Sequence, residues 1–480
     1  MANDFKSKTV SGIFWSAIDR FSVQGVQFLI QIIMARLLLP SDYGLIGMLA
    51  IFIQLSQLFM DSGFSESLIQ KQKRSQVDLS TVFYFNIAIS VLIYLGLYAC
   101  APYISDFFNM PELTQISRYI FLNLILISFS AIHKTILSIR VDFKTLTKIS
   151  FMSAVVSGVV GVTMAYMGYG VWSLVAQTLV QGLCTTLLSV YLVRWKPTLE
   201  FSMQSFKSLF SFGSKLLLTR TIHIVYTNIY TLVIGRRYSA TDLGYYSRAD
   251  QFATFPSSNI NTIIYRVTFP ILSSIQDDDV RLCHAYRSYI RISSFVIFPM
   301  MIGFLTLAEP VIVLLLTDKW MDCVLLLQIL CIDWMFDHLS IININLLLVK
   351  GHSDWSLKLE IVKKITAVTI LVCSLPFGIV GMCWGRAFYS VVAAVMNTHY
   401  TERLIGLTLK RQILDVIPSL LLASVMGLIV YGTTSLVDSY LLRIVIGVFI
   451  GAVFYIISAW LLNMKEFQSL LDIIKIKKHG

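Results

Sequence analysis

Residues 444–462 read IVIGVFIGAVFYIISAWLL, a run of nineteen residues without one charged side chain. A helix needs about 20 apolar residues to cross the hydrocarbon core of a bilayer, so this stretch predicts a membrane-spanning helix. A second, mostly apolar run precedes it at 412–434 (QILDVIPSLLLASVMGLIVYGTT), and only a short loop separates the two. Together the two runs predict a helical hairpin in a membrane.

The same pattern extends over the rest of the chain. Fourteen apolar runs, separated by short polar loops, lie at 10–35, 42–68, 80–104, 114–138, 148–168, 171–193, 208–234, 243–272, 288–317, 323–349, 356–376, 378–401, 412–434 and 439–463. Of the 480 residues 56% are hydrophobic and 14% charged, and the mean hydropathy is +0.74. Soluble domains carry roughly 25% charged residues. The composition therefore excludes a soluble enzyme, a disordered protein and a disulfide-stapled secreted domain, and predicts an all-α integral membrane protein with about 14 transmembrane helices.

Lysines and arginines in the loops predict the orientation. If the N-terminus is inside, the inner loops and tails hold 26 of the 38 cations. The outer loops then hold five, which are Arg36, Arg236, Arg237, Lys319 and Arg443. Because cytoplasmic loops collect Lys and Arg, this distribution predicts an even number of helices and two cytoplasmic termini. It also accounts for the net charge of +11 without nucleic acid as a partner.

An internal repeat predicts the organisation of the chain. Residues 11–61 align without gaps on 211–261, and six positions are identical: Ser11/Ser211, Arg20/Arg220, Arg36/Arg236, Asp42/Asp242, Gly44/Gly244 and Phe52/Phe252. The offset is six helices, an even number, so both halves have the same orientation. We predict two six-helix lobes related by a parallel repeat (1–200 and 201–405), followed by a C-terminal helix pair with a tail (406–480). Transporters commonly bind their substrate between two such bundles.

Polar side chains form a stripe on the first and on the seventh predicted helix. Spacings of three and four put each set on one helix face: Ser16, Arg20, Gln24, Gln27 and Gln31, and then Arg220, His223, Thr227 and Thr231. Either hydrogen bonds between helices or a wet cavity would satisfy the Gln and Thr side chains. A cation at bilayer depth costs ~2.5–3.5 kcal/mol, so for Arg20 and Arg220 we favour a water-filled cavity. His223 is either a packed histidine or a proton carrier.

Two acids in the tenth predicted helix form a further candidate site. Asp333 and Asp337 are four residues apart and share a face of a continuous helix. They predict either a coupling-ion site or structural partners for Arg386 or water. Asp250 is expected to pair with a nearby arginine. The seven cysteines show no metal-ligand spacing, so neither a metal site nor a cofactor is predicted.

Four ordered segments carry a resemblance to a known family. The loop 35–44 (ARLLLPSDYG) resembles polysaccharide transporters of the MOP flippase superfamily. Segments 61–70 (DSGFSESLIQ), 168–174 (GYGVWSL) and 242–249 (DLGYYSRA) resemble its Wzx-like branch of O-antigen and colanic acid exporters, the lipopolysaccharide biosynthesis proteins. The resemblance covers nearly the whole chain. It implies two lobes around a central cavity and a flippase that moves undecaprenyl-diphosphate-linked oligosaccharide to the outer leaflet of a bacterial inner membrane, for surface polysaccharide assembly.

The resemblance also implies a binding site. Related flippases hold the diphosphate with cavity arginines from the first, second, seventh and eighth helices, and Arg20, Arg220 and Arg248 match that pattern. The second helix departs from it, because Met48 stands opposite Arg248 in the repeat. Guanidinium groups bind phosphate oxygens in bidentate fashion, which agrees with this assignment. Implied partners are the lipid-linked oligosaccharide, membrane lipids, and a polysaccharide polymerase with its chain-length regulator.

Two other functions compete with this one. A multidrug exporter of organic cations, from the same superfamily, would favour a cavity rich in acids and aromatics, whereas the deep charges here are mainly arginines. A membrane glycosyltransferase or polymerase needs carboxylates or a metal site, commonly in a sizeable extramembrane loop. The longest outer loops span only about ten residues, too short to carry such a site. We therefore predict a transporter rather than an enzyme.

Overall fold

The computed structural model describes residues 23–468, apart from eight side chains inside helices: Phe212, Lys215, Leu216, Thr219, Ile263, Arg266, Val267 and Ser353. Within this range the regular structure is helical, and no strand occurs there. The chain divides into two compact units. The first ends at Gly244 and the second begins at Tyr245, so the boundary falls inside one long helix, α11. The lobes predicted from the repeat divide instead at residues 200 and 405, and that division stays a prediction.

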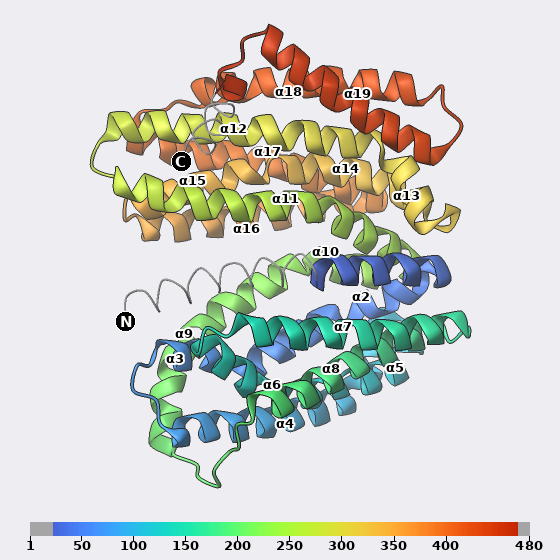
Figure 1. Cartoon of the computed structure of the whole chain (residues 1–480), viewed down its shortest axis with the longest axis vertical. Coiled ribbons are helices and arrows are strands. Elements are labelled where there is room, and N and C mark those ends of the chain that lie inside the picture. The colour runs from blue at the N-terminus through green and yellow to red at the C-terminus, as the bar shows by residue number, and fades with distance from the viewer. Residues whose placement is uncertain (1–22, 469–480) are drawn as a thin grey trace. The chain divides into compact units, whose positions relative to one another are not determined.

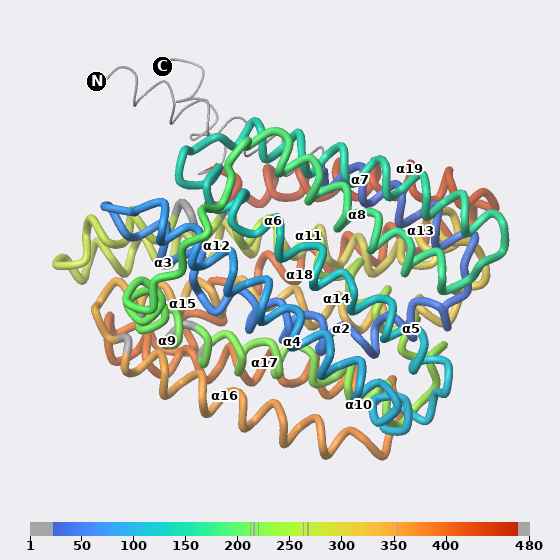
Figure 2. The backbone as a smooth tube through the Cα atoms, turned by 90° about the horizontal axis from the view of Figure 1, so that it is seen from below, coloured from blue at the N-terminus to red at the C-terminus, as the bar shows by residue number. Residues whose placement is uncertain are grey.

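The first unit contains a helical segment, nine further helices and the first turn of the next one. They are Val23–Leu37, α2 (Pro40–Asp61), α3 (Phe64–Gln70), α4 (Gln76–Phe108), α5 (Leu113–Ile120), α6 (Leu122–Ile139), α7 (Phe143–Tyr166), α8 (Val171–Val193), α9 (Met203–Thr227), α10 (Ile229–Arg237) and the start of α11 (Ala240–Ser274). Helices α7 and α8 lie side by side (Figures 1 and 2). Phe64 and Leu68 of the short α3 pack into a buried cluster with residues of α4, α6, α7, α8 and α9. Helix α3 is thus anchored in the core of this unit.

The second unit continues along α11 and ends in two long apolar helices. Its elements are α12 (Asp279–Thr306), α13 (Ala308–Leu316), η1 (Asp318–Trp320), α14 (Cys323–Met335), α15 (Asp337–Val349), α16 (Ser353–Ser374), η2 (Leu375–Phe377), α17 (Gly378–Ile405), α18 (Leu409–Thr434) and α19 (Tyr440–Leu461). Arg287 of α12 pairs in bidentate fashion with Asp415 of α18, with N···O distances of 2.7 and 2.8 Å. Tyr286 donates to Asn343 of α15 at 2.7 Å. Polar contacts therefore fix α12 against two neighbours.

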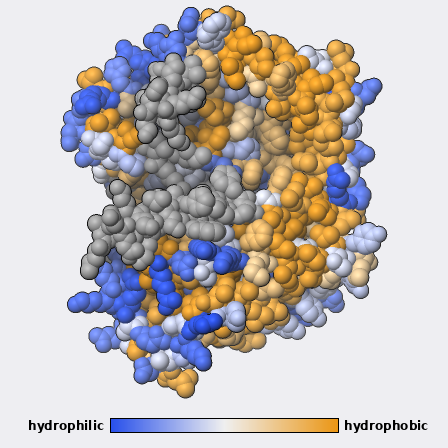
Figure 3. Space-filling view, viewed as in Figure 1, coloured by the Kyte–Doolittle hydropathy of each residue, from blue (hydrophilic) through white to orange (hydrophobic). Residues whose placement is uncertain are grey.

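The apolar helices agree with a multi-pass membrane protein. Ten of the described stretches are long and apolar enough to cross a membrane, and one of them, Asp354–Ile405, holds the helix pair α16 and α17. In each unit hydrophobic residues cover much of the visible face, and hydrophilic residues gather toward the helix ends (Figure 3). Helices overlap all fourteen predicted ranges as far as these are described. The exact number of fourteen spans and the two-lobe repeat stay predictions.

Some of the breaks between helices are predicted from the sequence, and others are not. The chain turns where we predict it, at Gly168 and Gly170 (φ 83° and 53°) and at η2 with Gly378 (φ 75°). Five ranges expected as single helices are each two: 42–68, 114–138, 208–234, 288–317 and 323–349. Pro310 explains one break, since its ring removes the hydrogen bond to the carbonyl of Thr306. Asn228 explains a second, because its side chain donates to the carbonyl of Ile224 at 2.9 Å and competes with the backbone.

Two glycines let helices in the first unit touch backbone to backbone. A Cβ on Gly44 of α2 would lie 1.7 Å from the carbonyl oxygen of Ala240. A Cβ on Gly244 would lie 1.9 Å from the carbonyl oxygen of Pro40. The contact is thus reciprocal, and both pairs of positions are related by the offset of 200. Because only glycine lacks a Cβ, any other residue at these two positions would push the backbones apart.

Candidate functional site

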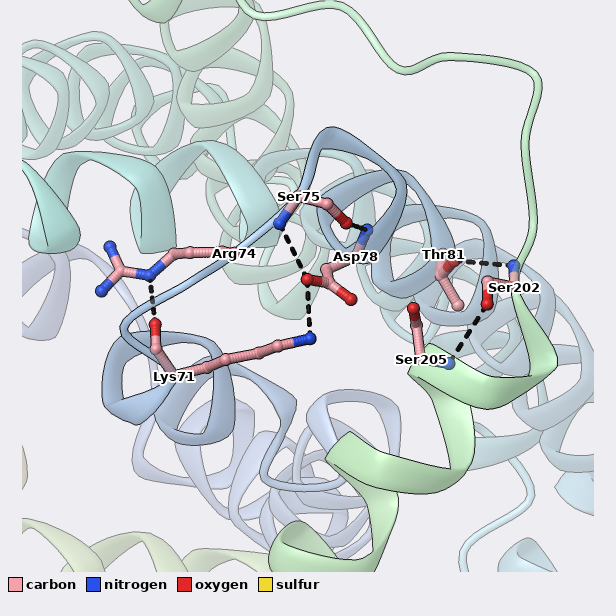
Figure 4. A network of polar contacts seen from close by, with 7 residues as sticks. All are labelled: Lys71, Arg74, Ser75, Asp78, Thr81, Ser202 and Ser205. Atoms are coloured by element: carbon pink, nitrogen blue, oxygen red, sulfur yellow. Dashed lines mark hydrogen bonds and ion pairs between the residues drawn. The ribbon is translucent and has the colours of Figure 1, made fainter.

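Helix α9 carries the predicted polar stripe of the seventh span, and its start is anchored on α4 (Figure 4). The linker 194–202 precedes it. The amide of Ser202 donates to Thr81 Oγ1 at 3.0 Å, and the hydroxyl of Ser202 caps α9 by accepting from the amide of Ser205 at 3.2 Å. At the start of α4, the carboxylate of Asp78 pairs with Lys71 at 2.8 Å and accepts a hydrogen bond from the backbone amide of Ser75, the N-cap residue of α4. The N-cap of α9 is therefore held to α4 by a hydrogen bond.

The two faces of α9 differ in polarity. Three exposed apolar residues share one face: Leu218, Ile222 and Val225, exposed by 67%, 52% and 41%. Arg220, His223 and Thr227 lie on the opposite face, and all three are exposed as well. An apolar face can contact lipid, but a face with an arginine and a histidine is costly there. The polar face of α9 is therefore suited to a water-filled space.

Arg220 pairs with an acid that the sequence analysis does not single out. Its guanidinium lies 2.9 Å from the carboxylate of Glu66 on α3, and the two side chains are 46% and 38% exposed. Asp61, at the end of α2, accepts a hydrogen bond from Ser65, which in turn accepts one from Thr135 at 3.0 Å. The site thus combines one arginine with two nearby acids. Glu66 lies inside the predicted span 42–68, and an acid inside a span is a signal that a cation partner exists.

One polar pair joins α2 to the break between α9 and α10. The side-chain nitrogen Nδ2 of Asn228 donates to Gln54 Oε1 at 3.1 Å. For Gln54 the structure therefore has a hydrogen bond between helices. Thr227 instead donates to the carbonyl of His223 at 3.0 Å within its own helix. Thr231 is half-buried on α10.

The first predicted stripe is only partly described. Gln24, Gln27 and Gln31 are half-buried on one face of the helical segment Val23–Leu37. Arg20, the deepest charge of that stripe, lies outside the described residues. Its cavity role stays a prediction.

Arg248 belongs to the second unit and is 6% exposed. Its guanidinium donates to Gln251 and lies 5.9 Å from the ring centroid of Trp320. This side chain is already engaged by its own surroundings. A role for Arg248 in diphosphate binding stays a prediction.

A dense polar cluster joins three helices of the second unit. Arg386 of α17 lies 2.9 Å from Asp250 of α11 and 2.7 Å from Asp333 of α14. It also donates to the hydroxyl of Tyr246 at 2.7 Å. The indole of Trp334 donates to Asp250 at 3.0 Å. The guanidinium carbon of Arg386 lies 5.3 Å from the ring centroid of Trp334. One arginine thus faces two carboxylates, and Asp250 has the arginine partner that we expect.

Asp337 occupies a different position from the one a continuous helix would give it. The break at Phe336 separates it from Asp333, so Asp337 begins α15. It accepts a hydrogen bond from Asn261 of α11 at 2.8 Å. No group of three or more His, Cys, Asp or Glu residues in the described chain is placed to hold a metal ion. The coupling-ion role of Asp333 and Asp337 stays a prediction.

Comparisons with solved structures identify the fold. The lipid II flippase MurJ in an inward closed conformation matches with a TM-score of 0.76 at 14% identity, covering 94% of this chain and 99% of MurJ. An inward-facing multidrug resistance MATE family transporter of the MOP superfamily matches with a TM-score of 0.62 at 18% identity, over 82% of this chain and 98% of the transporter. At these identities the likeness establishes a shared fold, which is that of multi-pass membrane proteins.

Comparisons of sequence identify the family. The teichuronic acid biosynthesis protein TuaB of Bacillus subtilis (strain 168) is 26% identical over 454 residues, covering 93% of this chain and 94% of TuaB. The lipopolysaccharide biosynthesis protein WzxC of Escherichia coli (strain K12) is 24% identical over 444 residues, covering 89% of each chain. Residues 33–325 match the family described as "Polysaccharide biosynthesis protein". The resemblance noted from the four sequence segments is thereby confirmed, and the chain belongs to this polysaccharide biosynthesis family.

Proposed function

We propose that this protein is a flippase that moves undecaprenyl-diphosphate-linked oligosaccharide repeat units from the cytoplasmic to the outer leaflet of a bacterial inner membrane. The units serve the assembly of a surface polysaccharide, and both termini of the chain are cytoplasmic. Family membership supports the polysaccharide part of this proposal, and the fold shared with a lipid II flippase supports the transport of a lipid-linked substrate. The polysaccharide polymerase and its chain-length regulator are the proposed protein partners.

The polar face of α9 is the observation that carries the proposal. Arg220, His223 and Thr227 are exposed on a helix whose opposite face is apolar. A lipid diphosphate presents clustered negative charge, which a guanidinium group binds strongly. Arg220 binds the diphosphate, and the hydroxyl and amide groups of the two stripes solvate the sugars. The isoprenoid tail stays in the bilayer during the passage.

Glu66 gives Arg220 a resting partner. Without substrate, the ion pair of 2.9 Å holds the guanidinium in place. A diphosphate carries more negative charge than one carboxylate and therefore displaces Glu66 from Arg220. Release of the substrate on the other side restores the ion pair. Alternating access, in which the two lobes rock around the site, moves the head group between leaflets.

The cluster around Arg386 is the proposed coupling device. Asp250 and Asp333 together carry one more negative charge than Arg386 neutralises. Asp337 adds a further acid, which Asn261 holds. A proton or a small cation binds among these acids and balances the charge during each cycle. Dependence of transport on a proton or sodium gradient, and its loss in Asp337→Asn, tests this role.

A depletion strain tests the flippase proposal. Complete lipid-linked units should accumulate on the cytoplasmic leaflet, and Arg220→Ala should fail to rescue export at normal protein levels. Arg443→Ala is the matched control, because that arginine lies at the start of α19, outside both polar stripes, where it contacts Glu309 at 3.7 Å and donates to the carbonyl of Val437. Drug sensitivity on depletion with normal surface glycan would replace the proposal by multidrug export. Sugar transfer by the purified protein would identify a glycosyltransferase instead.

A further inference from the structure

A cavity of about 490 Å³ opens at one end of the first unit. The residues that line it come from the end of α4 and from α10, which are neighbours in the fold (Figure 2). They are Phe107, Asn109, Leu232, Val233, Arg236 and Arg237. None of the polar stripes contributes to this lining, so the cavity is a feature apart from the proposed transport site.

The lining is positively charged and contains no acid. None of the ion pairs among the described residues involves Arg236 or Arg237. The guanidinium of Arg236 lies 5.4 Å from the ring centroid of Phe107, which holds it at the wall of the cavity. Both arginines are in the last turn of α10. The helix dipole there offsets only about half a unit charge, so most of the positive charge is left for a ligand.

Aromatic residues place this end of the unit at the membrane surface. Tyr103 and Phe107, near the end of α4, are 74% and 46% exposed. On the neighbouring elements Tyr119 contacts Trp172, with ring centroids 5.4 Å apart. Tyrosine and tryptophan collect at the interface between hydrocarbon and water, where the phosphate groups of lipids also lie. The cavity is therefore at the depth of lipid phosphates.

We propose that this cavity binds the phosphate group of a membrane lipid. Arg236 and Arg237 bind the phosphate oxygens, and Asn109 supplies an amide beside them. Leu232 and Val233 contact the first apolar carbons of the lipid. The site goes beyond the proposed transport function, because it is a second phosphate site outside the polar stripes. Its ligand is either the diphosphate of an isoprenoid lipid or the phosphate of an ordinary phospholipid.

Native mass spectrometry of the full chain in detergent tests the site with two probes, undecaprenyl diphosphate and phosphatidylglycerol. All samples carry Arg220→Gln, so that the proposed transport site does not contribute. We expect R236Q/R237Q to weaken binding of at least one probe about tenfold or more, because two charge-assisted contacts are lost. Arg118→Gln is the matched control, since this arginine lies over Tyr98 at 4.5 Å at the same end but outside the cavity. The single change Arg237→Gln, which leaves the stacked Arg236 in place, serves if the double variant does not fold.

The outcomes separate the two lipids. Loss of undecaprenyl diphosphate alone identifies the isoprenoid lipid as the ligand, and loss of phosphatidylglycerol alone identifies an ordinary phospholipid. Loss of both probes identifies a general site for lipid phosphates. Unchanged binding of both probes in the folded variants, or an equal loss in Arg118→Gln, overturns the proposal. A depletion strain that exports glycan normally would end the flippase proposal without affecting this binding result.

Discussion

The ion pair between Arg220 and Glu66 predicts that two substitutions in one contact change substrate affinity in opposite directions. Arg220→Gln removes the group that binds the diphosphate. Glu66→Gln removes the competitor and leaves the guanidinium in place. A purely structural ion pair predicts something else, namely the same loss of stability from either change and no opposite effects on binding.

The magnitudes follow from exposure and chemistry. Both side chains are more than a third exposed, at 46% and 38%, so the pair stabilises the fold by only about 0.2–1 kcal/mol. Glu66→Gln should therefore tighten diphosphate binding by at most about fivefold. A hydrogen bond to a charged group contributes about 1.5–3 kcal/mol, so Arg220→Gln should weaken binding by about 10- to 150-fold. Neither change should lower the free energy of unfolding by more than about 1 kcal/mol.

Binding of undecaprenyl diphosphate to the purified chain measures both effects. The assay uses an R236Q/R237Q background, so that the cavity beside Phe107 does not contribute. Thermal unfolding of the same samples checks stability, and Arg118→Gln is the control for loss of a positive charge. Weaker binding in Glu66→Gln, or unchanged binding in Arg220→Gln, would refute the exchange of Glu66 for diphosphate.

Three further substitutions test the packing. Arg386→Met leaves two aspartates without their cation and should destabilise the fold by about 3–5 kcal/mol in thermal unfolding, whereas Arg443→Met, in a more exposed contact, should cost less than about 1 kcal/mol. Gly44→Ala places a Cβ against a backbone carbonyl and should cost about 1–3 kcal/mol, while Gly96→Ala, with open space around it, should leave the melting temperature unchanged or raise it. Tyr286→Phe removes a buried hydrogen bond and should cost about 1 kcal/mol, and an unchanged unfolding transition would contradict that role.

Much of the fold is predictable because hydrophobicity and loop signals are local. Long apolar runs predict the helical, membrane-spanning class, and the glycines at 168 and 170 predict the turn between α7 and α8. The break at Phe336 is not predictable in the same way. The apolar pattern continues through it, and the residue itself is compatible with an unbroken helix. Periodicity alone therefore predicts Asp333 and Asp337 on one face of a single helix, whereas the structure has them on two helices.

The site is harder to predict, because each partner depends on contacts between distant segments. The stripe on α9 follows from the spacing of Arg220, His223 and Thr227 alone. Its ion-pair partner lies 154 residues away on a short helix, α3, which the sequence analysis merges into a longer span. Asp250 shows the opposite case: an acid in an apolar run requires a cation, and Arg386 supplies it. Burial cost predicts that a partner exists, while only the fold identifies it.

The reciprocal contact at Gly44 and Gly244 has the self-complementary form of an isologous interface, in which one patch is used twice. Each side contributes a glycine and a backbone carbonyl four residues earlier, from Pro40 or Ala240. The carbonyl belongs to the backbone and does not depend on the side chain, so sequence drift at residues 40 and 240 leaves the interface intact. The side-chain requirement of this contact therefore falls on the two glycines. One segment that holds a glycine and the carbonyl four residues before it carries both halves of the contact. Two copies of such a segment are therefore enough to form it.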